Sequence, residues 1–345
     1  MKKLFFYIIT AAVVLITACD KNDEPEEPQN QITMTTQQST VNIQVGGLGT
    51  ITIDWGDKVI ETDDIINPGY DGRQTYSHTY SGASVHTIKI TGDNIEHLIC
   101  GENGLTNLDV SRYPDLVLLF CYVNALKNLD IRNNSALEAL ACGTNELTDL
   151  DVSKNAKLWF LNCSNNPLMN LDVSKIPALS TLYCFQNQLK NLDVSRNPEL
   201  SILYCYQNQL TNLNVSNNPK LLYLSCSLNQ LKNLDLSKNP ALLMFQCSAN
   251  ELTDLDVSKN TELIHLYCVQ NQLTKLALSN NTKLQDVYCQ GNKLTSDALN
   301  AMFGTLHNNI ISGQTKELYV AFNSGTNDCD ISIAENKGWS VNLVN

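Results

Sequence analysis

Cysteine recurs at an unbroken interval of 21 residues through the middle of the chain. Asparagine follows each of these cysteines three residues later, and leucine follows two residues after that. A repeat of constant length without insertions indicates a solenoid, in which each repeat forms one coil and packs on its two neighbours. Ten cysteines keep this spacing: Cys100, Cys121, Cys142, Cys163, Cys184, Cys205, Cys226, Cys247, Cys268 and Cys289.

The repeat has the consensus L-x-x-L-x-C-x-x-N-x-L-x-x-L-D-V-S-x-N-x-x. Its first eleven positions match the leucine-rich repeat signature, with cysteine at the third apolar site. Over roughly residues 95–323 the chain therefore resembles the cysteine-ladder repeats of the internalin J type of bacterial surface protein. This resemblance implies a mainly β, right-handed leucine-rich repeat solenoid whose concave face is a parallel sheet.

The length of the repeat restricts what each coil can contain. A unit of 21 residues has room for two short extended segments and two turns, but not for a strand and a three-turn helix. We therefore expect strands on both walls of the solenoid. Alternation in L-x-x-L-x-C turns the second leucine and the cysteine inward. The following asparagines, such as Asn187, Asn208 and Asn229, are expected to bind backbone groups where the strand turns.

The cysteines form a column, because in-register parallel coils place equivalent residues about 4.8 Å apart. A disulfide tolerates that separation but needs converging Cβ vectors, which parallel neighbours supply poorly. We expect Cys184, Cys205, Cys226 and their equivalents to be reduced, buried and apolar in behaviour. Zinc is the alternative, but one thiol per coil forms a line instead of a tetrahedron. Cys329 lies outside the column and has no obvious partner.

Aspartate also recurs, in the L-D-V-S segment. We interpret this segment as a short strand that ends in a turn capped by side-chain to backbone hydrogen bonds. Calcium binding is the alternative, although Asn214 and Ala277 interrupt the row. The aspartates are Asp109, Asp130, Asp151, Asp172, Asp193, Asp235 and Asp256.

The N-terminus is typical of a bacterial lipoprotein. Lys2 and Lys3 precede an apolar run that ends in Ile16-Thr17-Ala18-Cys19, which resembles a lipobox with Cys19 as the lipidated residue. We expect residues 1–18 to be a signal peptide and the acidic segment 19–31 to be a disordered tether. Acidic residues after the lipidated cysteine resemble an export signal of diderm bacteria. That resemblance implies a surface-exposed lipoprotein of the outer membrane.

Charge narrows the class of partner. The chain has 23 basic and 35 acidic residues, a net charge of −12, which argues against nucleic acid and anionic membrane surfaces. We expect attachment to the membrane through the lipid alone, no cofactor, no metal and a monomer.

Short β-rich runs separated by Gly, Asn, Asp and Pro fill residues 32–94 and predict a small β-sandwich that caps the first coil. The segments Ile53-Asp54-Trp55-Gly56-Asp57 and Tyr76-Ser77-His78-Thr79-Tyr80 resemble the WGDG and HTY signatures of PKD-type immunoglobulin-like modules, with Lys58 replacing the last glycine. The resemblance implies that Asp54, Asp57 and His78 are turn and packing residues, not a catalytic cluster.

Residues 95–294 form the predicted solenoid, and residues 295–345 its C-terminal cap. Helix-capping residues and helical apolar spacing begin at Thr295, and a second short helix is expected between Asp330 and Gly338. Between them, Leu318–Asn323 repeats the strand and the asparagine, with Val320 in the place of the cysteine, and a last strand is expected over residues 339–343.

The candidate binding site consists of aromatic and amide residues that face outward on the predicted concave sheet. Exposed aromatic surface tends to mark an interaction site, and Tyr and Trp dominate binding hot spots, although aromatics are also good strand formers. These residues predict adhesion or binding of a protein or glycan. The candidates are Trp159, Phe160, Asn162, Tyr183, Phe185, Tyr204, Tyr206, Tyr223 and Tyr267.

Two other functions remain open. The chain could be a structural accessory or scaffold subunit of a surface complex for nutrient uptake, with a partner that covers the aromatic face permanently. An enzyme is disfavoured, because the five histidines are scattered and no nucleophile, base and orienting residue fall together.

Overall fold

The computed structural model describes residues 30–66, 73–82, 84–310 and 315–344. The predicted signal peptide, Cys19 and nearly all of the predicted tether lie outside these residues. Within the described residues, no helix has the length and apolar character needed to cross a membrane.

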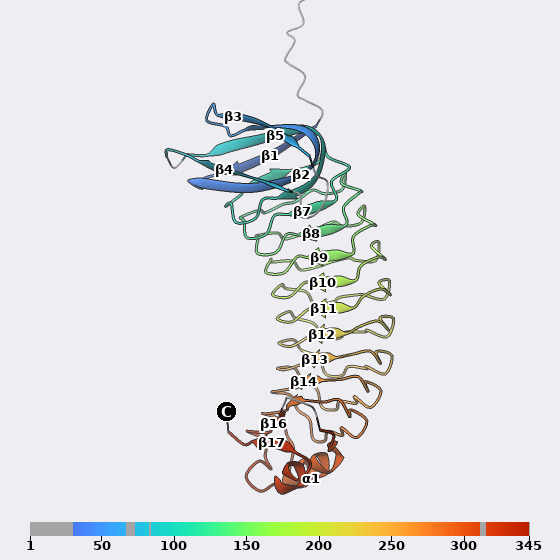
Figure 1. Cartoon of the computed structure of the whole chain (residues 1–345). Helices are drawn as coiled ribbons and strands as arrows, with labels where there is room; N and C mark the ends of the chain where they lie inside the picture. Colours follow the sequence, from blue (N-terminus) through green and yellow to red (C-terminus); the bar gives the residue numbers. More distant parts are fainter. Residues whose placement is uncertain (1–29, 67–72, 83, 311–314, 345) are drawn as a thin grey trace, which may run out of the picture.

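Each coil of the solenoid contributes one three-residue strand to a parallel sheet (Figure 1). The register is constant, because residues 21 apart lie opposite each other, as in the pair Leu182 and Leu203. The strands are β7 (Leu118–Phe120), β8 (Ala139–Ala141), β9 (Phe160–Asn162), β10 (Thr181–Tyr183), β11 (Ile202–Tyr204), β12 (Tyr223–Ser225), β13 (Met244–Gln246), β14 (His265–Tyr267) and β15 (Asp286–Tyr288).

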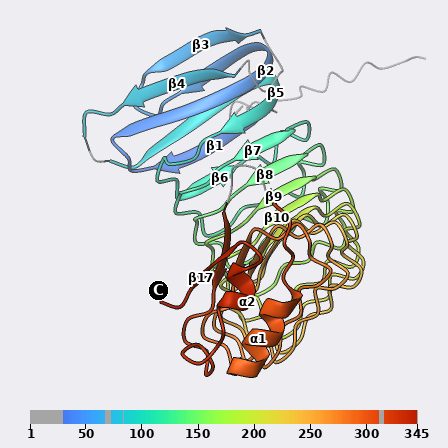
Figure 2. The ribbon, with the colours of Figure 1, turned by 60° about the horizontal axis from the view of Figure 1, so that its bottom comes forward.

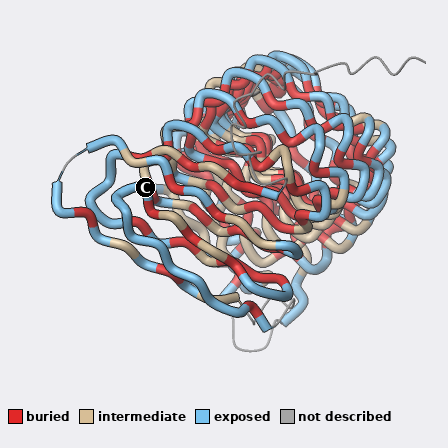
Figure 3. The backbone as a smooth tube through the Cα atoms, turned by 90° about the horizontal axis from the view of Figure 1, so that it is seen from above, coloured by how far each residue is buried: buried red, intermediate tan, exposed pale blue. Residues whose placement is uncertain are grey.

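The core is a stack of identical layers, and buried residues recur at the same place in every coil (Figure 3). The central residue of each of these strands and the cysteine after it have no solvent exposure. All ten ladder cysteines are buried and free. The predicted column of buried thiols is therefore confirmed.

The asparagine after each cysteine joins two coils. Asn208 Nδ2 donates to the carbonyls of Cys184 (2.9 Å) and Cys205 (3.1 Å), and its Oδ1 accepts from the backbone N–H of Leu189 at 3.0 Å. Asn187 and Asn229 bind in the same pattern. The predicted role of this asparagine is confirmed, because its amide binds backbone groups of its own coil and of the preceding one.

The second wall differs from the prediction of strands on both walls. Among the described L-D-V segments, only β6 (Asn107–Asp109) is a strand, and a single bridge joins Asp193 to Asn214. A second column of asparagines binds backbone carbonyls that the N–H groups of a neighbouring strand would otherwise bind. Asn218 Nδ2, for example, donates to the carbonyls of Val194 (3.0 Å) and Asn197 (2.9 Å). Its fully buried members are Asn134, Asn155, Asn197, Asn218, Asn239, Asn260 and Asn281.

The aspartates of this wall cap turns, as predicted. Asp193 Oδ1 accepts from the backbone N–H of Ser195 at 2.9 Å, and Asn214 makes the same bond to Ser216 at 3.0 Å. The hydrogen bonds that the serine two positions on donates hold the pKa of Asp151, Asp172, Asp193, Asp235 and Asp256 below its usual range. At Asp130 the Arg132 guanidinium has this effect and lowers the pKa to about 2.

These lowered pKa values predict progressive loss of stability in acid. A carboxyl whose pKa is lower in the folded state than in the unfolded state stabilises the fold above its unfolded pKa, about 3.9, and loses this effect as the pH falls toward its folded pKa. We expect Tm to fall between pH 5 and pH 2, with a shallower slope in an Asp151→Asn, Asp172→Asn, Asp193→Asn triple variant. Asn214 already shows that asparagine keeps the turn. Equal slopes in the triple variant and the wild-type protein would contradict this assignment.

A left-handed residue stands two positions after each ladder cysteine. Val123, Thr144 and Leu228 have φ values of 52°, 55° and 56°, and only Gly291 is a glycine at this position within the cysteine repeats. The left-handed conformation costs a non-glycine residue about 1–2 kcal/mol. We expect Val123→Gly to raise Tm. The strain relieved exceeds the conformational entropy that glycine loses on folding, so the free energy of unfolding should rise by about 0.5–1 kcal/mol. Gly291→Ala is the matched reverse substitution and should lower Tm. If Tm did not change in either variant, or changed in the opposite direction, the turn would not be strained.

The N-terminal strands extend the solenoid sheet beyond its first coil (Figure 2). They are β1 (Gln31–Thr36), β2 (Thr40–Asp54), β3 (Ile60–Ile65), β4 (Gln74–Thr79) and β5 (His86–Ile99). The end of β5 is the strand of the first coil, where it pairs in parallel with β7 on one side and antiparallel with β2 on the other, and β1 pairs antiparallel with β6 on the second wall. Both walls of the first coil are thus covered by hydrogen-bonded strands. The strands belong to one 17-strand sheet with the repeats, and the PKD-like identity of this unit stays a prediction.

Two β-rich runs of the sequence merge into the single long strand β2. Its first half pairs with β4 and its second half with β3, while β5 follows it on the other side. The register shifts between Gly46 and Gly47, where a Cβ on Gly47 would stand 1.9 Å from the Asn94 carbonyl oxygen. Glycine here therefore permits β2 and β5 to approach each other closely. In the sequence the same glycines suggest a break between the two β-rich runs that form β2.

The Asp54–Asp57 segment forms a turn. Asp54 and Asp57 each accept from a backbone N–H two residues on, at 2.9 and 3.1 Å, and Asp57 Oδ2 lies 2.7 Å from His78 Nε2. The His78 ring stacks on Trp55 with centroids 5.0 Å apart. These contacts agree with turn and packing roles.

The C-terminal cap contains the elements that the sequence predicts. Helix α1 (Ser296–Thr305) begins after the Thr295 cap, and β16 (Lys316–Tyr319), α2 (Ser332–Glu335) and β17 (Trp339–Asn342) follow. Asn323 continues the first asparagine column by donating to the carbonyls of Cys289 and Val320. The parallel sheet ends with β17.

Candidate functional site

The outward face of the parallel sheet carries three columns of side chains. We call it the sheet face. Two of its columns are the first and third residues of each strand from β7 to β15, continued on β16 by Glu317 and Tyr319, which pair with Asp286 and Tyr288. The third column is the residue after each ladder cysteine, with Ala321 in the last coil. The sequence predicts that this is the concave side of the solenoid. Most side chains of the face in β9–β16 are only half-buried.

Aromatic side chains form a contiguous cluster on the three neighbouring coils of β9, β10 and β11. The Phe160 ring meets the Tyr183 ring edge-on at 5.8 Å, and Tyr183 stacks on Tyr204 at 5.1 Å. Beside them Phe185 stacks on Tyr206 at 4.5 Å with an interplanar angle of 6°. The structure thus brings these five predicted residues together. We call them, with Trp159 and Tyr223, the central aromatic cluster.

The remaining predicted residues differ in position. Trp159 precedes β9, is 42% exposed, and its ring centroid lies 5.8 Å from that of Phe160. Asn162 accepts from the hydroxyl of Ser164 at 2.7 Å, so its amide oxygen is engaged locally. Tyr223 begins β12, opposite Ile202. Tyr267 stands on β14, two coils beyond Tyr223.

Tyr267 belongs to a second aromatic group that the sequence analysis missed. Tyr267 stacks on Tyr288 at 4.9 Å, and Tyr288 on Tyr319 at 4.2 Å. His265 Nδ1 lies 2.6 Å from Asp286 Oδ2 on the same strands. The available signal was tyrosine before the cysteine in two successive repeats, and again before Val320.

The ladder thiols are chemically inert in the folded protein. Burial raises the pKa of Cys205 to about 12, and the other ladder cysteines shift in the same direction. A thiol that stays protonated is neither a nucleophile nor a metal ligand. The chemistry of this region therefore rests on the outward side chains.

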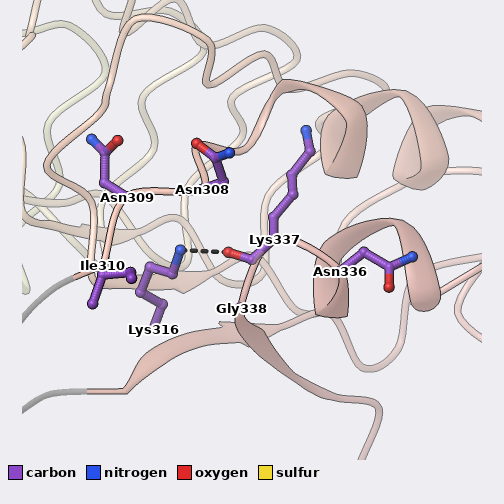
Figure 4. A pocket seen from close by; sticks show the side chains of 7 residues that line it. All are labelled: Asn308, Asn309, Ile310, Lys316, Asn336, Lys337 and Gly338. Atoms are coloured by element: carbon purple, nitrogen blue, oxygen red, sulfur yellow. Dashed lines mark hydrogen bonds between the residues drawn. The ribbon is translucent and has the colours of Figure 1, made fainter.

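A hollow of about 370 Å³ lies in the C-terminal cap beside Lys316 (Figure 4). Lys316 Nζ donates to the carbonyls of Lys337 (2.6 Å) and His307 (3.3 Å), each just beyond the end of a helix. Lys337 Nζ in turn donates to the carbonyls of Phe303 and Gly304 in α1. Both ammonium groups thus cap carbonyls at helix C-termini, a structural role.

Comparison with known proteins identifies the architecture. No family model and no curated protein matches the chain. Among solved structures, the functional domain of InlJ from Listeria monocytogenes, which includes a cysteine ladder, is 30% identical with a TM-score of 0.64. The match covers 73% of this chain and 56% of that one, so the chain spans little more than half of the InlJ structure. The chain is a leucine-rich repeat solenoid with a cysteine ladder.

Other leucine-rich repeat structures share the fold at lower identity. A leucine-rich repeat protein of Leptospira interrogans is 21% identical, with a TM-score of 0.54 and coverage of 72% of this chain and 71% of that one. The plant peptide hormone receptor RGFR1, in complex with RGF2, is 20% identical, with a TM-score of 0.56 and coverage of 68% and 40%. These similarities place the solenoid among leucine-rich repeat folds.

Proposed function

We propose that this leucine-rich repeat protein is a non-enzymatic binding protein whose sheet face takes a protein ligand. The observation that carries the proposal is the central aromatic cluster, in which Phe160, Tyr183 and Tyr204 form a continuous half-buried surface over three coils. Such a surface gains free energy when a partner covers it, because apolar area leaves water and the rigid rings lose little entropy.

Ring geometry favours a protein ligand over a glycan. Sugars bind aromatic residues by lying on an open ring face. In the sheet face, the inner faces of Tyr183 and Tyr204 cover each other, as do those of Phe185 and Tyr206. These stacked faces are closed to a sugar, whereas ring edges and tyrosine hydroxyls suit the mixed apolar and hydrogen-bonding surface of a polypeptide. A plant receptor of the same fold in complex with RGF2 supports this choice.

The test is a Tyr183→Ala, Tyr204→Ala, Tyr206→Ala triple variant of the soluble fragment from residue 30 onward. Ligands would first be selected from protein and glycan arrays with the wild-type fragment. We expect the triple variant to lose at least 100-fold in affinity while its circular dichroism stays unchanged, since all three side chains lie outside the buried core. The corresponding Tyr→Phe variant keeps the rings and should retain most of the binding. Unchanged affinity in the alanine variant would refute the assignment of the site.

We further propose that the protein is anchored at the cell surface through lipidated Cys19, which the lipobox motif supports. Incorporation of labelled palmitate that disappears in Cys19→Ala, with protease accessibility on intact cells, tests this. A constant partner recovered by cross-linking under all growth conditions would instead favour the scaffold role in an uptake complex.

A further inference from the structure

The sheet face is uncharged except near its C-terminal end. In its three columns, as far as the structure describes them, the only acidic residues are Asp286 on β15 and Glu317 on β16, and no lysine or arginine occurs. Besides the tyrosines, His265 on β14 is the one other titratable group in the described part of these three columns. The face therefore has two chemically different parts, the central aromatic cluster and an acidic end.

The two carboxylates lie directly opposite each other in the parallel register of β15 and β16. Like charges in this arrangement destabilise a sheet, unless another group offsets them. One Asp286 oxygen, Oδ2, contacts His265 Nδ1 at 2.6 Å, and the Glu317 oxygens accept from the Tyr319 hydroxyl (2.6 Å) and from Thr315 (3.4 Å). These contacts orient both carboxylates, but only His265 can offset charge, and it can offset at most one.

The second aromatic group runs alongside this pair. Tyr288 and Tyr319 stack at 4.2 Å on the same two strands as Asp286 and Glu317. A guanidinium or ammonium ion is attracted to paired carboxylates, and the planar guanidinium of arginine has the geometry best suited to bind them. The acidic end thus has the composition of a site for one basic side chain.

We propose that the ligand of the sheet face is an extended polypeptide segment with an arginine or lysine bound at Asp286 and Glu317 and apolar side chains on the central aromatic cluster. This inference rests on the proposed function and specifies the class of its partner. Four coils separate Tyr204 from Asp286, about 19 Å at the spacing of neighbouring strands. An extended chain covers this distance in about six residues.

Synthetic fourteen-residue peptides provide the test. Each peptide carries a Trp-Leu pair and one arginine, separated by two, four, six, eight or ten residues, in a background of serine and alanine. We expect binding to the soluble fragment to be strongest at a separation near six. Replacing the arginine with citrulline, which has the same shape and no charge, should weaken binding about tenfold. An equal affinity for the arginine and citrulline peptides would overturn the inference.

Variants separate this inference from the proposed function. In the Asp286→Asn, Glu317→Gln double variant, we expect arginine and citrulline peptides to bind equally. The Asp235→Asn, Asp256→Asn control removes the same charge from turn aspartates and should keep the tenfold difference. If the difference persists in the double variant, the basic residue binds elsewhere and the inference is wrong. If the alanine triple variant binds every peptide like the wild-type fragment, the proposed function itself fails.

Discussion

Replacing Asn208 with alanine is expected to lower the free energy of unfolding by about 3–5 kcal/mol. The side chain makes three buried hydrogen bonds, to the carbonyls of Cys184 and Cys205 and from the N–H of Leu189. Alanine supplies no replacement partner, and each buried backbone group left unpaired costs about 1–3 kcal/mol. Urea denaturation followed by circular dichroism measures the change.

Asn214→Ala is the matched control for this substitution. Asn214 is exposed and makes one side-chain hydrogen bond, to the backbone of Ser216. Water can take over that bond, so the loss should stay below about 1 kcal/mol. Similar losses for the two variants would mean that the buried asparagine column does not hold the coils together.

Replacing Cys205 with serine should destabilise the protein by about 2–3 kcal/mol, and with alanine by about 1–2 kcal/mol. Serine is expected to destabilise the protein more than alanine although it is closer to cysteine in size, because it buries a hydroxyl group in an apolar column. Cys205→Val should cost least, because Val320 already fills the equivalent position with no solvent exposure. The three free energies of unfolding can be compared by chemical denaturation.

Cys329→Ser is the control for this series. Cys329 is only half-buried and lies outside the ladder, so its substitution should change stability by less than about 0.5 kcal/mol. If serine at position 205 were tolerated as well as valine, the column would have to contain polar partners for the hydroxyl, contrary to its apolar surroundings.

The sequence predicts the solenoid well because the residues that define it repeat without exception. Cys205 and Asn208 are recognisable from their spacing alone, and their burial and bonding follow from the alternation of a strand. The helix after Thr295 is predictable for a similar reason, since capping residues and helical spacing are local signals. In each case one local pattern leads to one structure.

Other features depend on contacts between coils and were missed. The asparagine of S-x-N also repeats, but Tyr113 and Ile176 interrupt its column, and the pattern alone predicts a strand equally well. Nothing in Val123 or Thr144 indicates a left-handed backbone, which the geometry of the coil imposes on whichever residue occupies that position. Asp286 and Glu317 stand three residues before Cys289 and Val320, but their significance depends on the pairing of β15 with β16, which brings the two carboxylates side by side.

The bonding pattern of the asparagine columns restricts how a chain of this kind can change in evolution. Each asparagine of the first column from Asn124 to Asn292 donates to a carbonyl 24 positions earlier, and each asparagine of the second column donates to carbonyls 21 and 24 positions earlier. A deletion or duplication other than a full repeat preserves these bonds only if the changed segment loops out of the coil, as it does before β16, where Asn323 still donates to the Cys289 carbonyl. Gain or loss of whole repeats leaves each bond with an equivalent partner. The length of the sheet face can therefore change in evolution by whole repeats, through recombination between them. The outward side chains of each repeat can change independently of that length.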